Sequence, residues 1–326
     1  MKANFLSVTI VAACMVMVSC NNDDTAIPAN DGAVRFTSGI TATPDTRVAI
    51  DGEGNSLWEA DDPVGIYMVG HNTFQPAEGN ANVKYTASQA GASTAFTAGA
   101  AAIFYPQDET TAVDFIAYHP YTAAVTELTY PVALSQQTPQ TAIDLMTAQA
   151  DNNGSGYTKA DGRNNIVVNL AFSHRLVKLV MNITKDASVT GNITAVSING
   201  MNTTALFDLT SATDGFSEAG APAGITPFTA TAGTKYEAIL LPVAALADAH
   251  TVTFTTDGGD VYTWAMKKEI ASLEAGKIYT YTVNVTRYGV SATGSINKWV
   301  VGSTGTGTAE YPPQKKTEYY ETRKYT

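Results

Sequence analysis

Apolar and polar residues alternate with a period of two along most of the chain after residue 30. Every second position is Tyr or Val in 279–285, and is Ile, Val, Leu or Phe in 166–172. This period is typical of β-strands with one face in a core. The phase changes at 177–183, where Val177, Leu179, Met181 and Ile183 alternate with residues such as Lys178 and Asn182. Because a phase change moves the buried set to the other face, we predict a bend or bulge at 173–175.

Turn-forming residues separate these short runs. Asp257-Gly258-Gly259-Asp260 lies between Thr251–Thr256 and Val261–Met266, which predicts a β-hairpin. Frequent Gly, Pro and Asn between strands favour β-sandwiches over a parallel sheet. The sequence therefore predicts an all-β protein with a domain boundary near residue 174.

The first twenty residues have the pattern of a secretory signal. Lys2 precedes an apolar run over 5–18 that is too short for a comfortable membrane span, and polar residues follow at once. The run ends in Val18-Ser19-Cys20, which resembles the bacterial lipoprotein box, in which the cysteine is acylated and becomes the new N-terminus. Cys14 fits the same box, but cleavage there leaves apolar residues on the mature chain. We predict lipidation, for example with palmitate, at Cys20, with plain secretion as the alternative.

Composition narrows the function classes. Nineteen Lys and Arg against thirty Asp and Glu give a net charge of −11, so the chain lacks the basic surface of a nucleic-acid binder. The two cysteines, Cys14 and Cys20, both precede the alternating body. We therefore expect neither a disulfide nor a cysteine metal site in the body.

No catalytic or cofactor motif is present in the sequence. The four histidines are far apart, and neither a Gly-x-Ser-x-Gly elbow nor a phosphate-binding loop occurs. Acidic residues in 51–62 have a spacing faintly like a calcium loop, but Ser56 stands where an EF-hand needs Gly. We expect no enzyme activity, no metal and no cofactor.

A single amphipathic strand precedes the rest of the body. Val34, Phe36 and Ile40 share one face of 33–40, together with Ser38. Pro44 and Gly52 flank Arg47, which indicates an exposed connection open to proteases. Removing such a strand opens an apolar groove and a sheet edge on which a strand from another molecule can pair. An ordinary first strand followed by a surface Arg is the simpler interpretation.

Six segments in order resemble motifs of the fimbrillin family, whose members are subunits of the type V pilus and related surface lipoproteins. These segments cover about residues 34–300, and Trp58 and Trp299 lie in the first and the last of them. The six are Leu57-Trp58-Glu59-Ala60-Asp61-Asp62 with Val64-Gly65-Ile66-Tyr67, Phe115-Ile116-Ala117-Tyr118-His119-Pro120-Tyr121, Asp144-Leu145-Met146-Thr147-Ala148, Phe172-Ser173-His174-Arg175-Leu176 with Lys178-Leu179, Leu273-Glu274-Ala275-Gly276-Lys277-Ile278-Tyr279, and Ile296-Asn297-Lys298-Trp299. His119 stands where the family has Tyr, and we expect His174 to be a buried, hydrogen-bonded residue.

The resemblance implies two tandem transthyretin-like β-sandwich domains after a lipoprotein signal peptide. It also implies assembly in which an arginine-specific or trypsin-like protease cuts behind the first strand. The cut would fall at Arg47–Val48 and release a plug strand carrying Val34, Phe36 and Ile40. Arg35 is a poorer cleavage site, because it lies inside the strand that would have to be released. The expected parts are a signal peptide (1–19), a lipidated propeptide with the plug strand (20–47), two sandwiches (48–174 and 175–301) and a polar tail (302–326).

In the family, the C-terminal segment of a neighbouring subunit fills the emptied groove. The candidate donor residues here are Val290, Ala292, Ile296, Trp299 and Val301. Trp299 and Val301 are out of phase with the others, which predicts a bulge, and the tail beyond Gly302 departs from the usual family ending. It is a flexible extension, a donor or a modified tip.

The resemblance leaves two functions open. The first is a structural pilus subunit that supports adhesion, placed on the cell surface by a lipid in the outer membrane and joined to identical or paralogous subunits by strand complementation. The second is a permanently anchored lipoprotein that acts as a pilus anchor, a tip adhesin, or a glycan- or host-binding protein. A surface hydrolase is a third class without a nameable site.

Overall fold

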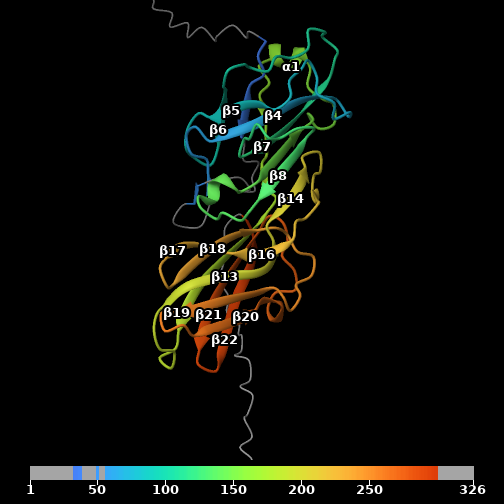
Figure 1. Ribbon diagram of the computed structural model, residues 1–326. Helices are drawn as coiled ribbons and strands as arrows, with labels where there is room; N and C mark the ends of the chain where they lie inside the picture. Colours follow the sequence, from blue (N-terminus) through green and yellow to red (C-terminus); the bar gives the residue numbers. More distant parts are fainter. Residues whose placement is uncertain (1–31, 39–48, 51–55, 300–326) are drawn as a thin grey trace, which may run out of the picture. The chain divides into compact units, whose positions relative to one another are not determined.

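The computed structural model describes residues 32–38, 49–50 and 56–299 (Figure 1). Regular structure in these ranges is almost entirely β, which confirms the predicted fold class. Helical structure there is limited to α1 (Lys159–Arg163) and two 3₁₀ turns, η1 (Gln140–Ala142) and η2 (Met266–Lys268). In the part of the chain that is described, no helix is long and apolar enough to span a bilayer.

The described strands form several sheets. An eight-stranded sheet has the order β10 (Val168–Asn169), β1 (Phe36–Ser38), β6 (Thr94–Ala98), β5 (Val83–Ala87), β4 (Pro63–Gly70), β7 (Val113–His119), β9 (Met146–Ala150) and β11 (Ser173–His174). Two small sheets hold β15 (Phe216–Ser217), β14 (Thr204–Asp208) and β8 (Thr129–Ala133), and the pair β2 (Ala49–Ile50) and β3 (Ser56–Leu57).

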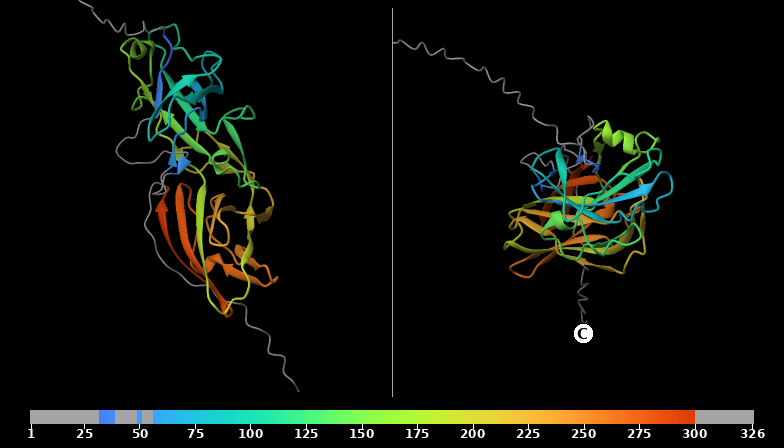
Figure 2. Two further views of the ribbon diagram at one scale, coloured as in Figure 1. Left: turned by 90° about the vertical axis from the view of Figure 1, so that its left-hand side faces the viewer. Right: turned by 90° about the horizontal axis from the view of Figure 1, so that it is seen from above.

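Apart from β14 and β15, the strands after residue 176 form two facing sheets. One has the order β17 (Phe228–Thr231), β18 (Lys235–Leu240), β12 (Val177–Lys185), β21 (Lys277–Thr286) and β22 (Gly289–Lys298). The other has the order β16 (Pro222–Ile225), β13 (Ile193–Asn202), β19 (Thr251–Thr256) and β20 (Val261–Ala265). In the left view of Figure 2, orange-red β21 and β22 lie beside β12 in one layer.

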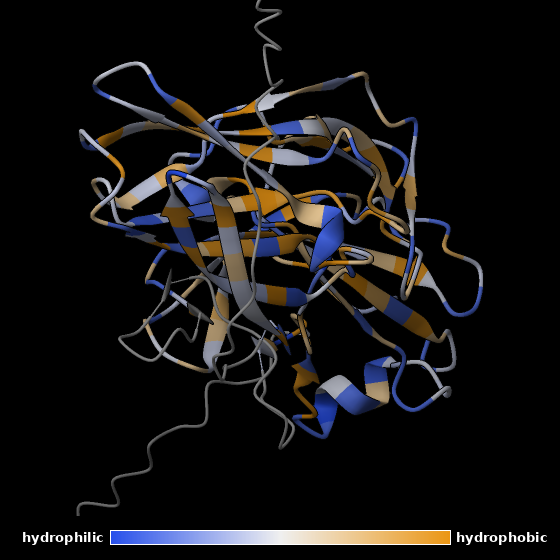
Figure 3. Cartoon of the chain, turned by 90° about the horizontal axis from the view of Figure 1, so that it is seen from below, coloured by the Kyte–Doolittle hydropathy of each residue, from blue (hydrophilic) through white to orange (hydrophobic). Residues whose placement is uncertain are grey.

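Period-two burial builds these layers. Tyr279, Tyr281, Val283 and Val285 of β21 are buried against β19 and β20, and their core draws only on residues 177–292 among those described. Figure 3 shows the same alternation as orange and paler or blue bands along the strands. A second core underlies the eight-stranded sheet and uses residues 34–172. The predicted hairpin is confirmed, because β19 and β20 pair antiparallel around 257–260.

The predicted bend at 173–175 is also confirmed. The chain pairs with β9 at Ser173–His174, and after two intervening residues it enters a different sheet as β12. A third core joins residues from both sides of this bend, and β8 pairs with β14 across it. The buried side chain of Gln137 adds three hydrogen bonds, to Leu134 O and to both backbone groups of Ile239. The domain boundary at 174 stays a prediction.

Three expectations from the pattern are wrong. Ile166 is 43% exposed, because the buried run begins only at Val168. Lys178 does not face solvent: it is 3% exposed, and its Nζ lies 2.8 Å from the Glu237 carboxylate on β18. No bulge interrupts β22, which pairs with β21 residue by residue as far as Lys298. Trp299 is out of phase with Val290, Ala292 and Ile296 because β22 ends at Lys298, before it.

Candidate functional site

The first strand, β1, lies inside the eight-stranded sheet (blue in Figure 1). It runs parallel to β10 on one side and antiparallel to β6 on the other. The backbone N–H groups of Val168 and Leu170 donate to Arg35 O and Thr37 O at 2.9 and 2.8 Å. Just before the strand, the Val34 N–H donates to Ile103 O at 2.8 Å. Loss of β1 would leave hydrogen-bonding groups unpaired on both neighbours.

The side chains of this segment alternate as the pattern predicts. Val34, Phe36 and Ser38 are at most 4% exposed, whereas Arg35 is exposed and donates to Asn165 Oδ1 at 3.0 Å. Phe36 is held edge-on by two rings, with centroid distances of 5.2 Å to Tyr85 and 5.0 Å to Phe115. The cleft that β1 occupies is therefore a closed aromatic site at its centre.

A hydrogen bond marks the far end of this cleft. The indole N–H of Trp58, which is 0% exposed, donates to Ser38 Oγ at 3.0 Å. The Trp58 ring also packs edge-on against Phe96 and Phe172. The sequence puts Ser38 on the buried face, but it does not reveal this partner, which directly follows β3. The only sign of this hydrogen bond in the sequence is a hydroxyl residue on an otherwise apolar strand face.

Several predicted site residues lie outside the described ranges. These are the lipidation site Cys20, the maturation site Arg47 with Val48, the plug residue Ile40 and the donor residue Val301. Their roles stay predictions.

The described part of the donor segment belongs to the protein's own fold. Val290 and Ala292 on β22 are 0% exposed and lie in the same core as β21. Ile296 is half exposed. Trp299 is buried, its backbone N–H donates to Gly276 O, and its ring stacks on His174 with a centroid distance of 4.1 Å.

Two histidines are buried in this part of the fold: His174, which forms the stack, and His119. The expectation for His174 is confirmed: it is 5% exposed and its Nδ1 lies 3.0 Å from the Asp144 carboxylate. His119 Nδ1 donates to Pro63 O at 3.0 Å, while its Nε2 has no hydrogen-bond partner among the described residues. Burial lowers the pKa of His119 to about 4, because a charged ring here would lose its hydration. The carbonyl groups of Pro63 and Thr141 and the Asp144 carboxylate oppose this shift without reversing it.

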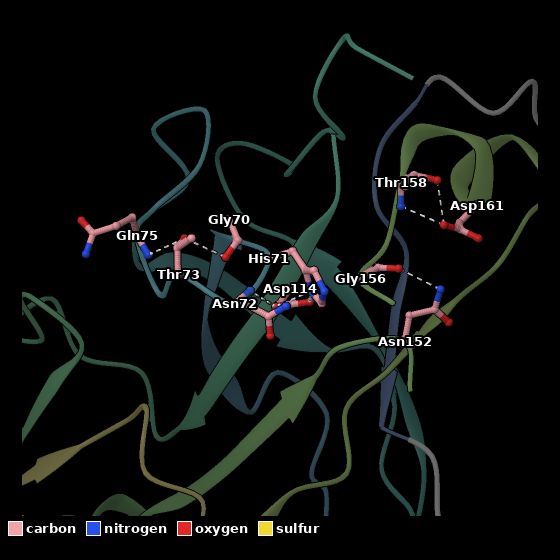
Figure 4. Close-up of polar contacts among 10 residues, drawn as sticks. All are labelled: Gly70, His71, Asn72, Thr73, Gln75, Asp114, Asn152, Gly156, Thr158 and Asp161. Carbon is pink, nitrogen blue, oxygen red and sulfur yellow. Dashed lines mark hydrogen bonds and ion pairs between the residues drawn. The ribbon is translucent and has the colours of Figure 1, made fainter. Parts of the chain in front are cut away.

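Polar contacts in the loops beside β4 and β7 are structural (Figure 4). His71 Nδ1 lies 2.9 Å from the Asp114 carboxylate, which also accepts the Asn72 backbone N–H. Asp161 accepts the backbone N–H and the hydroxyl of Thr158 at the start of α1. In the ranges described, no three His, Cys, Asp or Glu side chains gather into a possible metal site.

Comparison with known proteins identifies the scaffold. Residues 46–299 match the model of the Fimbrillin-like family. This chain belongs to the fimbrillin-like family. The resemblance inferred from the six motifs is thereby confirmed.

Relatives of this fimbrillin-like chain include named surface proteins. The putative fimbrium subunit Fim1C of Bacteroides uniformis is 32% identical over 328 residues, which is 95% of this chain and 100% of that protein. The crystal structure of a putative cell adhesion protein from Bacteroides uniformis is 32% identical, with a TM-score of 0.67 over 82% of this chain and 98% of that one. A putative cell adhesion protein from Bacteroides ovatus shares the fold at 20% identity, with a TM-score of 0.57 over 76% and 90% of the two chains.

Proposed function

We propose that this fimbrillin-like protein is a structural subunit of a type V-like surface pilus, and that β1 is a temporary occupant of its cleft. The observation that carries the proposal is the position of β1, an interior strand at the very start of the fold. Its buried side chains fill an aromatic cleft, and Arg47 follows a few residues later in the sequence. The fimbrium and cell-adhesion names of the relatives support the pilus role.

The proposed cycle starts at the membrane. The chain is exported as a lipoprotein, acylated on Cys20, and held at the outer membrane by its acyl chains. An arginine-specific or trypsin-like protease then cuts at Arg47–Val48. Arg35 resists this protease because the backbone around it is hydrogen-bonded within the sheet.

Replacement of β1 is energetically reasonable. Burying Val and Phe side chains contributes about 1.5–3 kcal/mol each, so an empty cleft is unstable. Another extended segment that pairs with β6 and β10 restores both the burial and the backbone hydrogen bonds. The cleft therefore drives assembly once the plug is no longer covalently attached.

The donor segment of each subunit is its C-terminal end. Val290 and Ala292 support the chain's own core, so within the candidate segment the exchangeable part starts after Trp299. Among the candidate donor residues, Val301 is the one that lies in that part.

The experiment uses the full chain and its Arg47→Gln variant. Both are treated with an arginine-specific protease, and mass spectrometry locates the cut. A fluorescent peptide copied from residues 33–40 is then added in excess. We expect cleavage after Arg47, and exchange of the peptide into the cut protein but not into the uncut variant. A chain that stays intact at Arg47, or a cut chain that never takes up the peptide, would favour a permanently anchored adhesin instead.

A further inference from the structure

The hydrogen bond between Trp58 and Ser38 restricts what the cleft can accept, if the proposed exchange of β1 takes place. The Trp58 indole N–H is buried, and its acceptor among the described residues is Ser38 Oγ at 3.0 Å. When β1 leaves, this acceptor leaves with it. A new strand that offers only an apolar side chain at this point leaves the N–H buried and unpaired, which costs free energy.

Each inward position of residues 34–38 has its own requirement. Val34 is 4% exposed and belongs to the core beneath the sheet, so its site takes an aliphatic side chain. Phe36 lies edge-on to Tyr85 and Phe115, so its site takes an aromatic ring. Ser38 is 0% exposed and accepts the Trp58 N–H, so its site takes a small hydroxyl. The three requirements fall at every second residue, as strand geometry demands.

We infer that the cleft selects an aliphatic-x-aromatic-x-Ser/Thr segment, read in either chain direction, and that this segment comes from a subunit whose C-terminal segment differs from residues 300–326 of this chain. Trp58 acts as the specificity residue for the hydroxyl. Shape and burial at the other two sites reject charged side chains.

The chain's own tail lacks the required pattern. Residues 300–326 hold no aliphatic, aromatic and Ser/Thr residues in this order at every second position, in either direction. The nearest segments are Glu318-x-Tyr320-x-Thr322 and, read backwards, Glu321-x-Tyr319-x-Thr317. Both put a glutamate into the buried site of Val34, where an unpaired carboxylate is strongly unfavourable.

One further segment fits only if Asn replaces the hydroxyl residue. Read backwards, Val301, Trp299 and Asn297 present an aliphatic, an aromatic and an amide side chain. Trp299 is already stacked on His174, and Asn297 is paired within β22. This segment is therefore engaged in its own fold.

The test compares peptides on the protein cut after Arg47. The probes are the peptide of residues 33–40, its Ser38→Ala and Ser38→Thr variants, and the tail peptide 300–326. Fluorescence anisotropy measures the Kd of each for the cut protein and for the cut Trp58→Phe protein. We expect Ser38→Ala to weaken binding by about tenfold or more, Ser38→Thr to bind nearly as well as the parent peptide, and the tail peptide to bind far more weakly.

The Trp58→Phe protein provides the matched control. Without the indole N–H, the parent and Ser38→Ala peptides should bind equally well, because the coupling is gone. If that variant does not fold, the peptide series on the unchanged protein still decides. Equal binding of the parent and Ser38→Ala peptides to the unchanged protein overturns the hydroxyl requirement. Tight binding of the tail peptide overturns the inference that the donor has a C-terminal segment different from residues 300–326. Failure of every peptide, the parent included, instead overturns the proposed function.

Discussion

Acidification should destabilise this protein through His119. The ring is 1% exposed, its Nδ1–H donates to Pro63 O, and a second proton would go to the unpartnered Nε2. Burial is the main reason why its pKa falls from 6.5 to about 4 in the folded state. The unfolded chain therefore binds this proton more tightly than the folded chain does.

This difference in proton binding determines how the unfolding free energy changes with pH. Between pH 6.5 and 4 the unfolded state is protonated at His119 while the folded state is not, so stability falls as the pH falls. Each pH unit in this window corresponds to about 1.4 kcal/mol, so by pH 4.5 the loss is about 2–3 kcal/mol. Asp62 acts in the opposite direction, because burial raises its pKa to about 6 and its neutral form favours the folded state. The pH dependence of wild-type stability therefore combines the opposing effects of His119 and Asp62, and a variant is needed to separate them.

The assay compares His119→Gln with the wild type in urea unfolding at pH 7.5 and 4.5. Gln can still donate to Pro63 O but cannot be charged, so its stability should fall by about 2–3 kcal/mol less than that of the wild type. Equal pH dependence of the wild type and His119→Gln would refute the reasoning.

Two further predictions concern buried contacts. Phe36→Ala in the full chain should lower the unfolding free energy by about 3–5 kcal/mol in urea melts, because it empties the aromatic site. The control Arg35→Ala should change the unfolding free energy by less than about 0.5 kcal/mol. A small effect of Phe36→Ala would show that β1 does not belong to the cooperative core. Lys178→Met should cost about 3 kcal/mol or more in thermal or urea melts, because it leaves the Glu237 carboxylate buried with weaker compensation. Adding Glu237→Leu should recover much of that loss, and a double variant as unstable as the single one would contradict the explanation.

Local alternation predicted most of the fold. The buried faces of 279–285 and of the run from Val177, the hairpin at 257–260 and the inward face of β1 all follow from side-chain period alone. Lys178 escaped this reasoning because its partner Glu237 belongs to a strand that becomes its neighbour only in the folded sheet. Without a known carboxylate partner, a lysine is expected to face solvent.

The candidate site was only partly predictable for the same reason. The sequence identified Val34 and Phe36 as one face, but the hydrogen bond between Ser38 and Trp58 joins residues twenty positions apart in the chain. The burial of Val290 and Ala292 likewise depends on which strand lies beside β22. Family motifs helped with His174, since the resemblance marked the position and the phase change explained its burial.

The sheet shared by β8 and β14 has a mechanical consequence. Five residue pairs and the two hydrogen bonds between Gln137 and Ile239 join chain segments that lie before and after the bend at 173–175. Only Arg175 and the fully buried Leu176 separate β11 from β12, so no slack linker is present between them. Bending at this point, or separating the core of residues 34–172 from that of residues 177–292, must therefore break this ladder, so a subunit of this kind is stiff at the bend.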